Sequence, residues 1–218
     1  MIDLHTHTIF SDGLLIPSEM ARYAVVRGYR AVALTDHGDH SNLDFIVPRI
    51  VKVAAVLTKA HGITVLPGIE LTYVPPEHIA AMAVQARQLG AKVVVVHGET
   101  IVEPVMPGTN LAALQAPIDI LAHPGLLTAE EARLAAERGV YLEITTRRGH
   151  SLTNGHVARL AREQGASLIL NNDAHLPEDL VTEEKAHKIA AGAGLTVDEI
   201  EAMFSHSQAL VERIAVAD

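Results

Sequence analysis

Histidine, aspartate and glutamate residues recur at the ends of short apolar segments in this sequence, and these residue types bind divalent metals. The chain contains 13 histidines in 218 residues, and it includes the close pairs His5-Thr6-His7 and Asp173-Ala174-His175. Residues two positions apart on a strand point to the same side of it, so each pair could bind one ion. Imidazole nitrogens and carboxylate oxygens bind Zn, Mn or Fe at about 2.0–2.2 Å. The residues of these types at or near the ends of the segments are His5, His7, Asp12, Asp36, His37, Glu70, His97, His123, Glu143, Asp173 and His175.

Seven apolar segments have the length and composition of buried parallel strands. They lie at residues 2–5, 31–36, 64–70, 92–97, 118–122, 140–145 and 167–172. Helical spacing is found from Pro17 to Gly28 and at residues 43–61, 77–89, 109–115, 128–138, 153–164, 182–192 and 196–213. Pro48 is expected to delay the start of the second helix or to kink it. The alternation predicts right-handed βαβ units and a parallel sheet.

Seven such strands could close into a barrel or form an open doubly wound sheet. An eight-fold barrel typically takes about 250 residues, so seven units fit this chain of 218 residues better. We expect residues 1–218 to form a single domain. The carboxyl ends of the strands in a parallel barrel converge on one face. The candidate ligands follow these ends, so the sequence predicts a metal cluster on that face.

Bulk composition excludes several classes of protein. The formal net charge is −9, which argues against a surface for long nucleic acid, since that surface needs a basic stripe. A small anionic substrate stays possible because bound metals reverse the local sign of the charge. The chain has no cysteine, which excludes disulfides and thiolate sites. It also shows no signal segment and no apolar run near the ~20 residues that span a bilayer, so a cytoplasmic protein without membrane contact is the default expectation.

An ordered set of short motifs covers nearly the whole chain and resembles the PHP (polymerase and histidinol phosphatase) domain family. The resemblance implies a distorted seven-stranded (β/α)7 barrel, similar to a TIM barrel, and a site for two to three divalent ions (Zn, Mn or Fe). The motifs are His5-Thr6-His7, Ser11-Asp12-Gly13, Thr35-Asp36-His37, Gly68-Ile69-Glu70, His97-Gly98, His123-Pro124-Gly125 and Asp173-Ala174-His175.

Carried over residue by residue, the resemblance implies three metal sites. His5, His7, Glu70 and Asp173 would hold the first ion, while Glu70, His97 and His123 would hold the second. Asp12, His37 and His175 would hold the third, and some family members have histidine where Asp12 stands.

The implied reaction is hydrolysis of a small phosphomonoester, similar to that of histidinol phosphatase. A hydroxide that bridges two metals would attack phosphorus. Glu70 would bridge those metals, and His97 and His175 would belong to the catalytic machinery.

Basic residues follow only one of the predicted strand ends, where Arg147 and Arg148 come after the sixth strand. A guanidinium can bind phosphate through two parallel hydrogen bonds, so we expect at least one of the two to contact the substrate phosphate. The Pro- and Gly-containing loop at residues 98–108 is expected to lie over the site. His40 and His150 also follow strand ends and could enter it.

Three other functions compete with this interpretation. The amidohydrolase barrel also starts with His-x-His, but it commonly uses a lysine on strand four, where this chain has His97. A PHP-type exonuclease or phosphodiesterase on short oligonucleotides or nucleotides would use the same ligands. A degenerate PHP binding module would have lost ligands, yet all nine positions are filled. The sequence leaves the substrate and the oligomeric state open.

Overall fold

The chain forms a parallel β/α barrel. The computed structural model describes residues 1–216. Seven strands run in the order β1-β2-β4-β5-β6-β7-β8, and every pairing is parallel. A bridge between Thr6 and Ala174 joins the first and last strands, so the barrel is nearly closed. The predicted fold is therefore confirmed. The strands are β1 (Ile2–Asp3), β2 (Ala31–Leu34), β4 (Thr64–Leu71), β5 (Val93–His97), β6 (Ile120–Ala122), β7 (Tyr141–Thr145) and β8 (Leu168–Asn171).

One additional strand, β3 (His37–Gly38), was not expected from the sequence. It pairs with the end of β4, where His37 lies opposite Glu70. Two residues are too short to give a periodic signal, and only the neighbouring strand makes them extended. This pairing places His37 beside Glu70 at the rim of the barrel.

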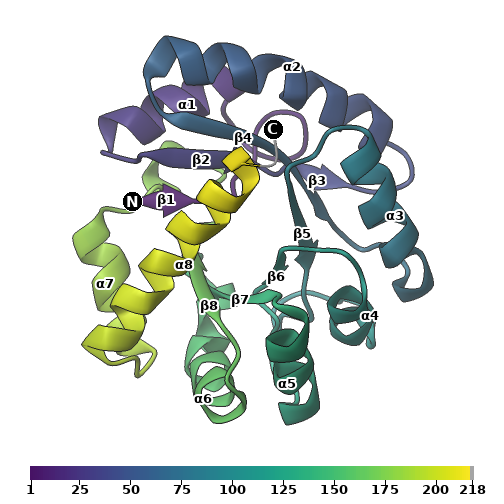
Figure 1. Cartoon of the computed structure of the whole chain (residues 1–218), viewed down its shortest axis with the longest axis vertical. Helices are drawn as coiled ribbons and strands as arrows, with labels where there is room; N and C mark the ends of the chain where they lie inside the picture. Colours follow the sequence, from purple (N-terminus) through teal and green to yellow (C-terminus); the bar gives the residue numbers. More distant parts are fainter. Residues whose placement is uncertain (217–218) are drawn as a thin grey trace.

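Helices surround the barrel (Figure 1), and their bounds agree closely with the sequence pattern. Helix ends have local causes: Thr128 and Glu131 form a capping box at the start of α5, and Gly139 ends it in the left-handed region. Pro48 lies inside α2 and does not delay its start, which is at Leu43. The helices are α1 (Pro17–Val26), α2 (Leu43–His61), α3 (Pro76–Gln88), α4 (Thr109–Gln115), α5 (Ala129–Arg138), α6 (Asn154–Gln164), α7 (Glu183–Gly192) and α8 (Val197–Val216).

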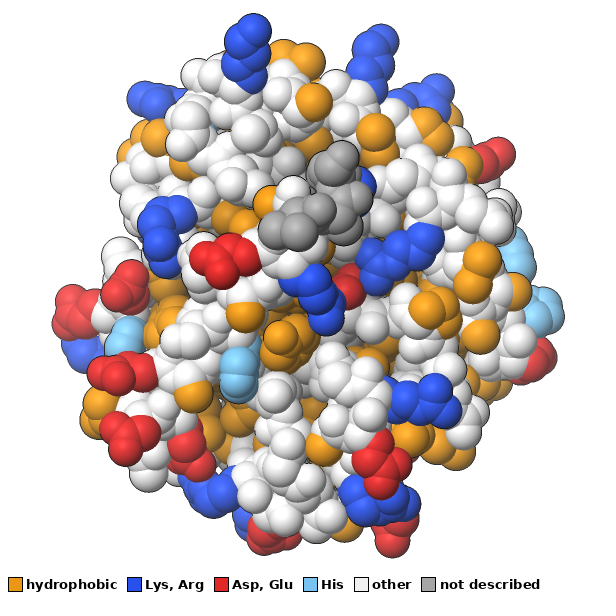
Figure 2. All heavy atoms as spheres, viewed as in Figure 1, with side chains coloured by type: hydrophobic (Ala, Val, Ile, Leu, Met, Phe, Trp, Pro, Cys, Tyr) orange, Lys and Arg blue, Asp and Glu red, His pale blue; other side chains and the backbone are white. Residues whose placement is uncertain are grey.

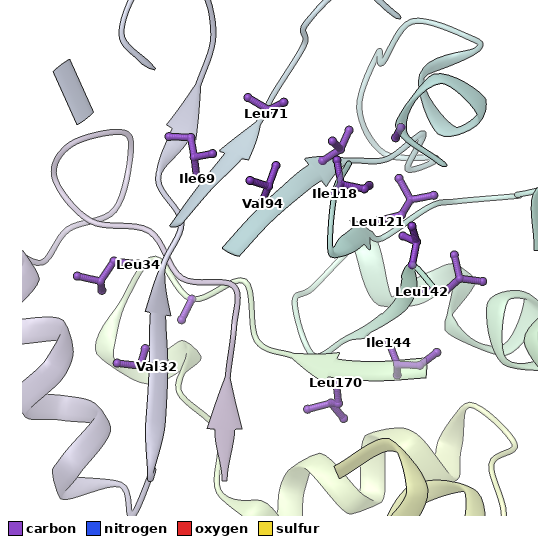
Figure 3. Packing of buried hydrophobic residues seen from close by; sticks show 14 of the residues in the cluster. Val32, Leu34, Ile69, Leu71, Val94, Ile118, Leu121, Leu142, Ile144 and Leu170 are labelled. Atoms are coloured by element: carbon purple, nitrogen blue, oxygen red, sulfur yellow. The ribbon is translucent and has the colours of Figure 1, made fainter. Parts of the chain in front are cut away.

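Strand side chains alternate between two apolar layers. Val32, Leu34, Val94 and other outward residues pack beneath the helices (Figure 3). The intervening residues, such as Val93 and Val95, fill the barrel interior. The same alternation carries His97 inward at the end of β5, because it lies two positions after Val95.

Helix α8 closes the end of the barrel where the strands begin (Figure 1). Its residues Leu210, Val211 and Ile214 pack against the apolar barrel interior. Figure 2 shows this face, on which charged side chains of both signs lie among hydrophobic ones. This mixture differs from the basic stripe of a nucleic-acid-binding face. Among the described residues, no helix combines the length and the apolar character needed to cross a membrane.

Candidate metal centre

The nine candidate ligands gather at the end of the barrel where the strands terminate, opposite α8. Seven of them are buried, whereas His37 is half-buried and Asp12 is exposed. Ligand atoms within 4.8 Å of one another define four overlapping groups. These groups are His5/His7/Glu70, His5/His123/Asp173, His7/Asp12/His37/His175 and His97/His123/His150.

The innermost part of the cluster joins β1, β4 and the segment after β8. The Nε2 atom of His5 lies 3.2 Å from Oε1 of Glu70, and Nε2 of His7 lies 3.1 Å from Oδ1 of Asp173. His5 and His7 approach both carboxylates. The structure therefore brings these four residues together, and their binding of one ion stays a prediction.

The outer part of the cluster is centred on Asp12. Its Oδ1 atom lies 3.1 Å from Nε2 of His175 and 3.4 Å from Nε2 of His37. His7 and His175 stack with ring centroids 4.2 Å apart, which connects this part to the inner one. Because Asp12 is exposed, this part faces the opening of the site.

The third part of the cluster contains His150, which is not one of the nine candidate ligands. His150 stacks on His123 with ring centroids 4.1 Å apart. Glu103, from the loop between β5 and α4, lies 3.1 Å from Nε2 of His97 and 3.4 Å from Nε2 of His150. The position of His150 after a strand end was its only signal in the sequence, and Glu103 had none.

Two of the inward-pointing ligands have left-handed backbone conformations. His123 has a φ of 27° and Asp173 a φ of 52°. Such conformations are rare outside glycine and cost of order 1–3 kcal/mol, so they persist where the surroundings impose them. Here they turn the chain immediately after β6 and β8. The resulting strain is concentrated at the candidate ligands.

The buried Glu143 carboxylate hydrogen-bonds to two of the candidate histidines and orients them. Oε1 of Glu143 accepts a hydrogen bond from Nδ1 of His5 at 2.8 Å, and Oε2 accepts one from the backbone N–H of His123 at 3.1 Å. This arrangement leaves Nε2 of His5 directed at the cluster, as in carboxylate–histidine–metal triads. Asp3, which is also buried near His5, accepts hydrogen bonds from the backbone of His5 and from Asn172.

Proton affinities in the cluster are strongly perturbed. Burial lowers the pKa of His5, but the Glu143 and Glu70 carboxylates outweigh burial and raise that pKa well above its usual value. Burial, opposed by His5, raises the pKa of Asp173 to about 7. Burial and neighbouring histidines hold the pKa values of His7 and His123 well below the usual range. Such opposed shifts are typical of functional sites.

The donor set fits divalent metal ions. Six buried polar side-chain atoms in the described chain have no hydrogen-bond partner, and all of them belong to the cluster. Buried polar atoms are nearly always paired in native proteins, and divalent ions would pair with the carboxylate oxygens and the unprotonated ring nitrogens among them. They are Nε2 of His5, both ring nitrogens of His7, Oε1 of Glu70, Nδ1 of His123 and Oδ1 of Asp173.

The two arginines after β7 have different positions. Arg147 lines the cavity of about 420 Å³ over the cluster, and its Nε atom lies 3.3 Å from Oδ2 of Asp173. Its Nη1 atom donates to the backbone carbonyl of Asp173 at 3.1 Å. Arg148 is exposed and lines a neighbouring hollow that also contains Arg147 and Lys185.

Comparison with known proteins identifies a family and several relatives. The family model of the PHP domain matches residues 3–101. An uncharacterized protein of Methanocaldococcus jannaschii is 48% identical over 97% of this chain and 99% of its own length. A probable phosphatase of Edwardsiella ictaluri is 31% identical over 82% of this chain and 80% of its own length.

Two solved structures share the fold. The histidinol phosphate phosphatase of Lactococcus lactis, complexed with zinc, L-histidinol and phosphate, has a TM-score of 0.63 and 17% identity over 89% of this chain and 94% of that one. A chain of archaeal ribonuclease P with mature tRNA has a TM-score of 0.75 and 14% identity over 98% of this chain and 91% of that one. At these identities the likeness concerns the fold alone.

Proposed function

The chain belongs to the PHP domain family, and we propose on this premise that it is a metal-dependent phosphatase that hydrolyses a small phosphomonoester. The observation that carries the proposal is the buried cluster of histidines and carboxylates, in which six atoms have no hydrogen-bond partner among the described residues. An acidic protein with such a cluster would become locally positive once the ions bind. That change of sign suits a phosphate group.

The nine ligands divide among three ions as the resemblance implies. His5, His7, Glu70 and Asp173 would hold the first ion. Glu70 also approaches His123 and His37, which supports its role as the bridge to the second ion, bound by His97 and His123. Asp12, His37 and His175 would hold the third ion at the open side. When bound, the ions supply a water of lowered pKa and neutralise charge on the phosphate oxygens.

Arg147 is the residue we assign to the substrate phosphate. Its Nε and Nη1 atoms are engaged by Asp173 and Asp179, which fixes the plane of the guanidinium. Its Nη2 donors have no partner among residues 1–216, and the side chain borders the cavity over the cluster. A guanidinium held in this way can donate to a phosphate oxygen without further ordering. Arg148 faces the neighbouring hollow, so the role falls to Arg147.

The size and charge of the site support a small substrate. The cavity of about 420 Å³ lies within the range of small-molecule sites. The formal net charge of the whole chain, −9, opposes the approach of long nucleic acid. Histidinol phosphate is one member of the substrate class that we propose.

The experiment is a phosphate-release assay on metal-free protein reconstituted separately with Mn, Zn or Fe. We expect hydrolysis of at least one small phosphomonoester, with no release before metal is added. Glu70→Ala protein reconstituted in the same way is the matched control. Trimming of short oligonucleotides without monoester hydrolysis would instead favour the exonuclease. Metal binding without either activity would favour a binding module.

A further inference from the structure

Glu103 and His150 lie outside the nine-residue ligand set, yet their side chains face the same cavity as His97. We propose that the Glu103 carboxylate and Nε2 of His150 are additional ligands of the second metal ion, joining Glu70, His97 and His123. The inference rests on the proposed metal centre and extends its coordination. It also assigns a function to the loop between β5 and α4, which supplies Glu103.

Distances between donor atoms support this assignment. Two donors at about 2.1 Å from one ion lie roughly 3.0 Å apart at right angles and roughly 3.4 Å apart in a tetrahedron. Oε2 of Glu103 lies 3.1 Å from Nε2 of His97, and Oε1 of the same carboxylate lies 3.4 Å from Nε2 of His150. The same separations occur where Asp12 meets His175 and His37, at 3.1 Å and 3.4 Å. The new pair therefore has the spacing of the ligands carried over from the family.

The hydrogen bond of the His150 ring at Nδ1 matches those of His5 and His97. Metal-binding histidines usually donate their second ring N–H to an oxygen. Nδ1 of His5 lies 2.8 Å from Glu143, and Nδ1 of His97 lies 3.1 Å from the carbonyl of Gly98. Nδ1 of His150 lies 2.8 Å from Oγ1 of Thr100. This contact orients the ring so that Nε2 faces Glu103 and the cluster.

The loop that carries Glu103 is fixed in place by its own contacts. Oε1 of Glu99 accepts hydrogen bonds from the backbone N–H groups of Gly108 and Asn110. The loop also packs tightly against the turn after His123, where a Cβ on Gly125 would lie 1.8 Å from the carbonyl oxygen of Glu99. Such a preorganised loop positions a ligand without a large entropic cost.

Tyr73 also contacts the Glu103 carboxylate. Its hydroxyl donates to Oε2 at 3.1 Å, and its ring stacks on His97 with centroids 5.6 Å apart. Tyr73 has a φ of 53°, an uncommon conformation that directs this side chain over the site. With Glu103 and His150 included, the second ion has three imidazoles and two carboxylates. That donor set suits Zn, Mn or Fe and disfavours Mg.

Metal binding to metal-free protein tests the inference without an activity assay. Glu103→Gln and His150→Gln are titrated with Zn or Mn in competition with a chromogenic chelator, and bound metal is counted by elemental analysis. We expect one of the bound ions to lose affinity by at least roughly 10–100-fold in each variant, while the others keep theirs. Cobalt-substituted protein should show a changed visible absorption spectrum for that ion alone.

Glu178→Gln and His78→Ala are the matched controls, because both side chains are exposed and lie outside the cluster. Thermal melting of the metal-free proteins checks that each variant is folded, and if His150→Gln does not fold, Glu103→Gln still tests the inference because Glu103 lies on a surface loop. Unchanged affinities and spectra in both variants would overturn the inference and leave the proposed phosphatase intact. If the wild-type protein bound no divalent metal, both proposals would fall.

Discussion

The two ends of the barrel each contain buried charged groups, but these groups differ in how completely they are hydrogen-bonded. Where the strands begin, the Asp119 carboxylate contacts Arg87 at 2.5 Å and Arg213 at 2.9 Å, and it accepts the backbone N–H of Val94 at 2.9 Å. Where the strands end, atoms of Glu70 and four other buried residues have no hydrogen-bond partner in the described chain.

The difference separates structural charge from functional charge. An ionised group that is buried must be paired, or it destabilises the fold. The Asp119 cluster meets this requirement with side chains of the chain itself. The cluster at the other end pairs its carboxylates with histidines and Arg147, yet it leaves six buried polar atoms without a hydrogen-bond partner among the described residues, so we attribute the proposed metal site to that end.

The largest expected effect is that of Glu70→Ala. The substitution removes the carboxylate that is proposed to bridge two ions, and we expect kcat/KM to fall by more than about 100-fold together with a loss of bound metal. Turnover and metal content are measured on the same samples. Near wild-type activity in the same metal buffer would exclude the bridging role of Glu70. It would also remove the argument that the end of the barrel where the strands terminate is the functional one.

Arg147→Ala is expected to have the next largest effect. A charge-assisted hydrogen bond is typically worth about 1.5–3 kcal/mol, so kcat/KM should fall roughly ten- to a hundred-fold with the metal content unchanged. Arg148→Ala is the matched control and should stay within about twofold. Equal effects of both substitutions would show that the phosphate contact is not specific to Arg147.

Asp119→Ala tests the opposite end of the barrel. It leaves the backbone N–H of Val94 and two guanidinium groups without their carboxylate, and a buried unpaired group costs about 1–3 kcal/mol. We expect the free energy of unfolding to decrease by this amount, as measured by urea denaturation. The kcat/KM of the folded protein should stay within about twofold. A selective loss of activity would assign a functional role to this end as well.

A pH dependence of metal affinity is the last expected effect, and it concerns binding of the outer ion rather than turnover or stability. Burial lowers the pKa of His37, but Glu70 and Asp12 outweigh it and raise that pKa to about 10 in the metal-free protein. His37 therefore carries a proton at neutral pH, and metal binding must displace it. The apparent affinity for the outer ion should rise with pH from 6 to 9, by up to about tenfold per unit for each displaced proton. Calorimetric titrations in buffers of different ionisation enthalpy measure the released protons, and an affinity that is independent of pH would contradict the shift.

Much of the fold could be predicted because periodicity and composition act locally. Buried parallel strands are continuous apolar runs, and the helices between them begin and end at residues such as Thr128 and Gly139. The predicted strands were confirmed, while β3 was missed because its extended conformation depends on pairing with β4. The gathering of the nine candidate ligands on one face could also be predicted, since the parallel topology brings strand ends together there; their role as ligands stays a prediction.

What the sequence alone determined is the set of residue types at the strand ends and the alternation that directs them inward. What only the tertiary structure decided is which loop residues reach the cluster and which partners they meet there. Glu103 enters through a loop with no periodic pattern, and His150 is oriented by Thr100, 50 residues away. Arg147 and Arg148 are adjacent in sequence, yet only Arg147 borders the cavity over the cluster. The physical reason is that periodicity fixes direction along a strand or helix, whereas a loop residue is positioned by contacts that form only when distant segments pack together.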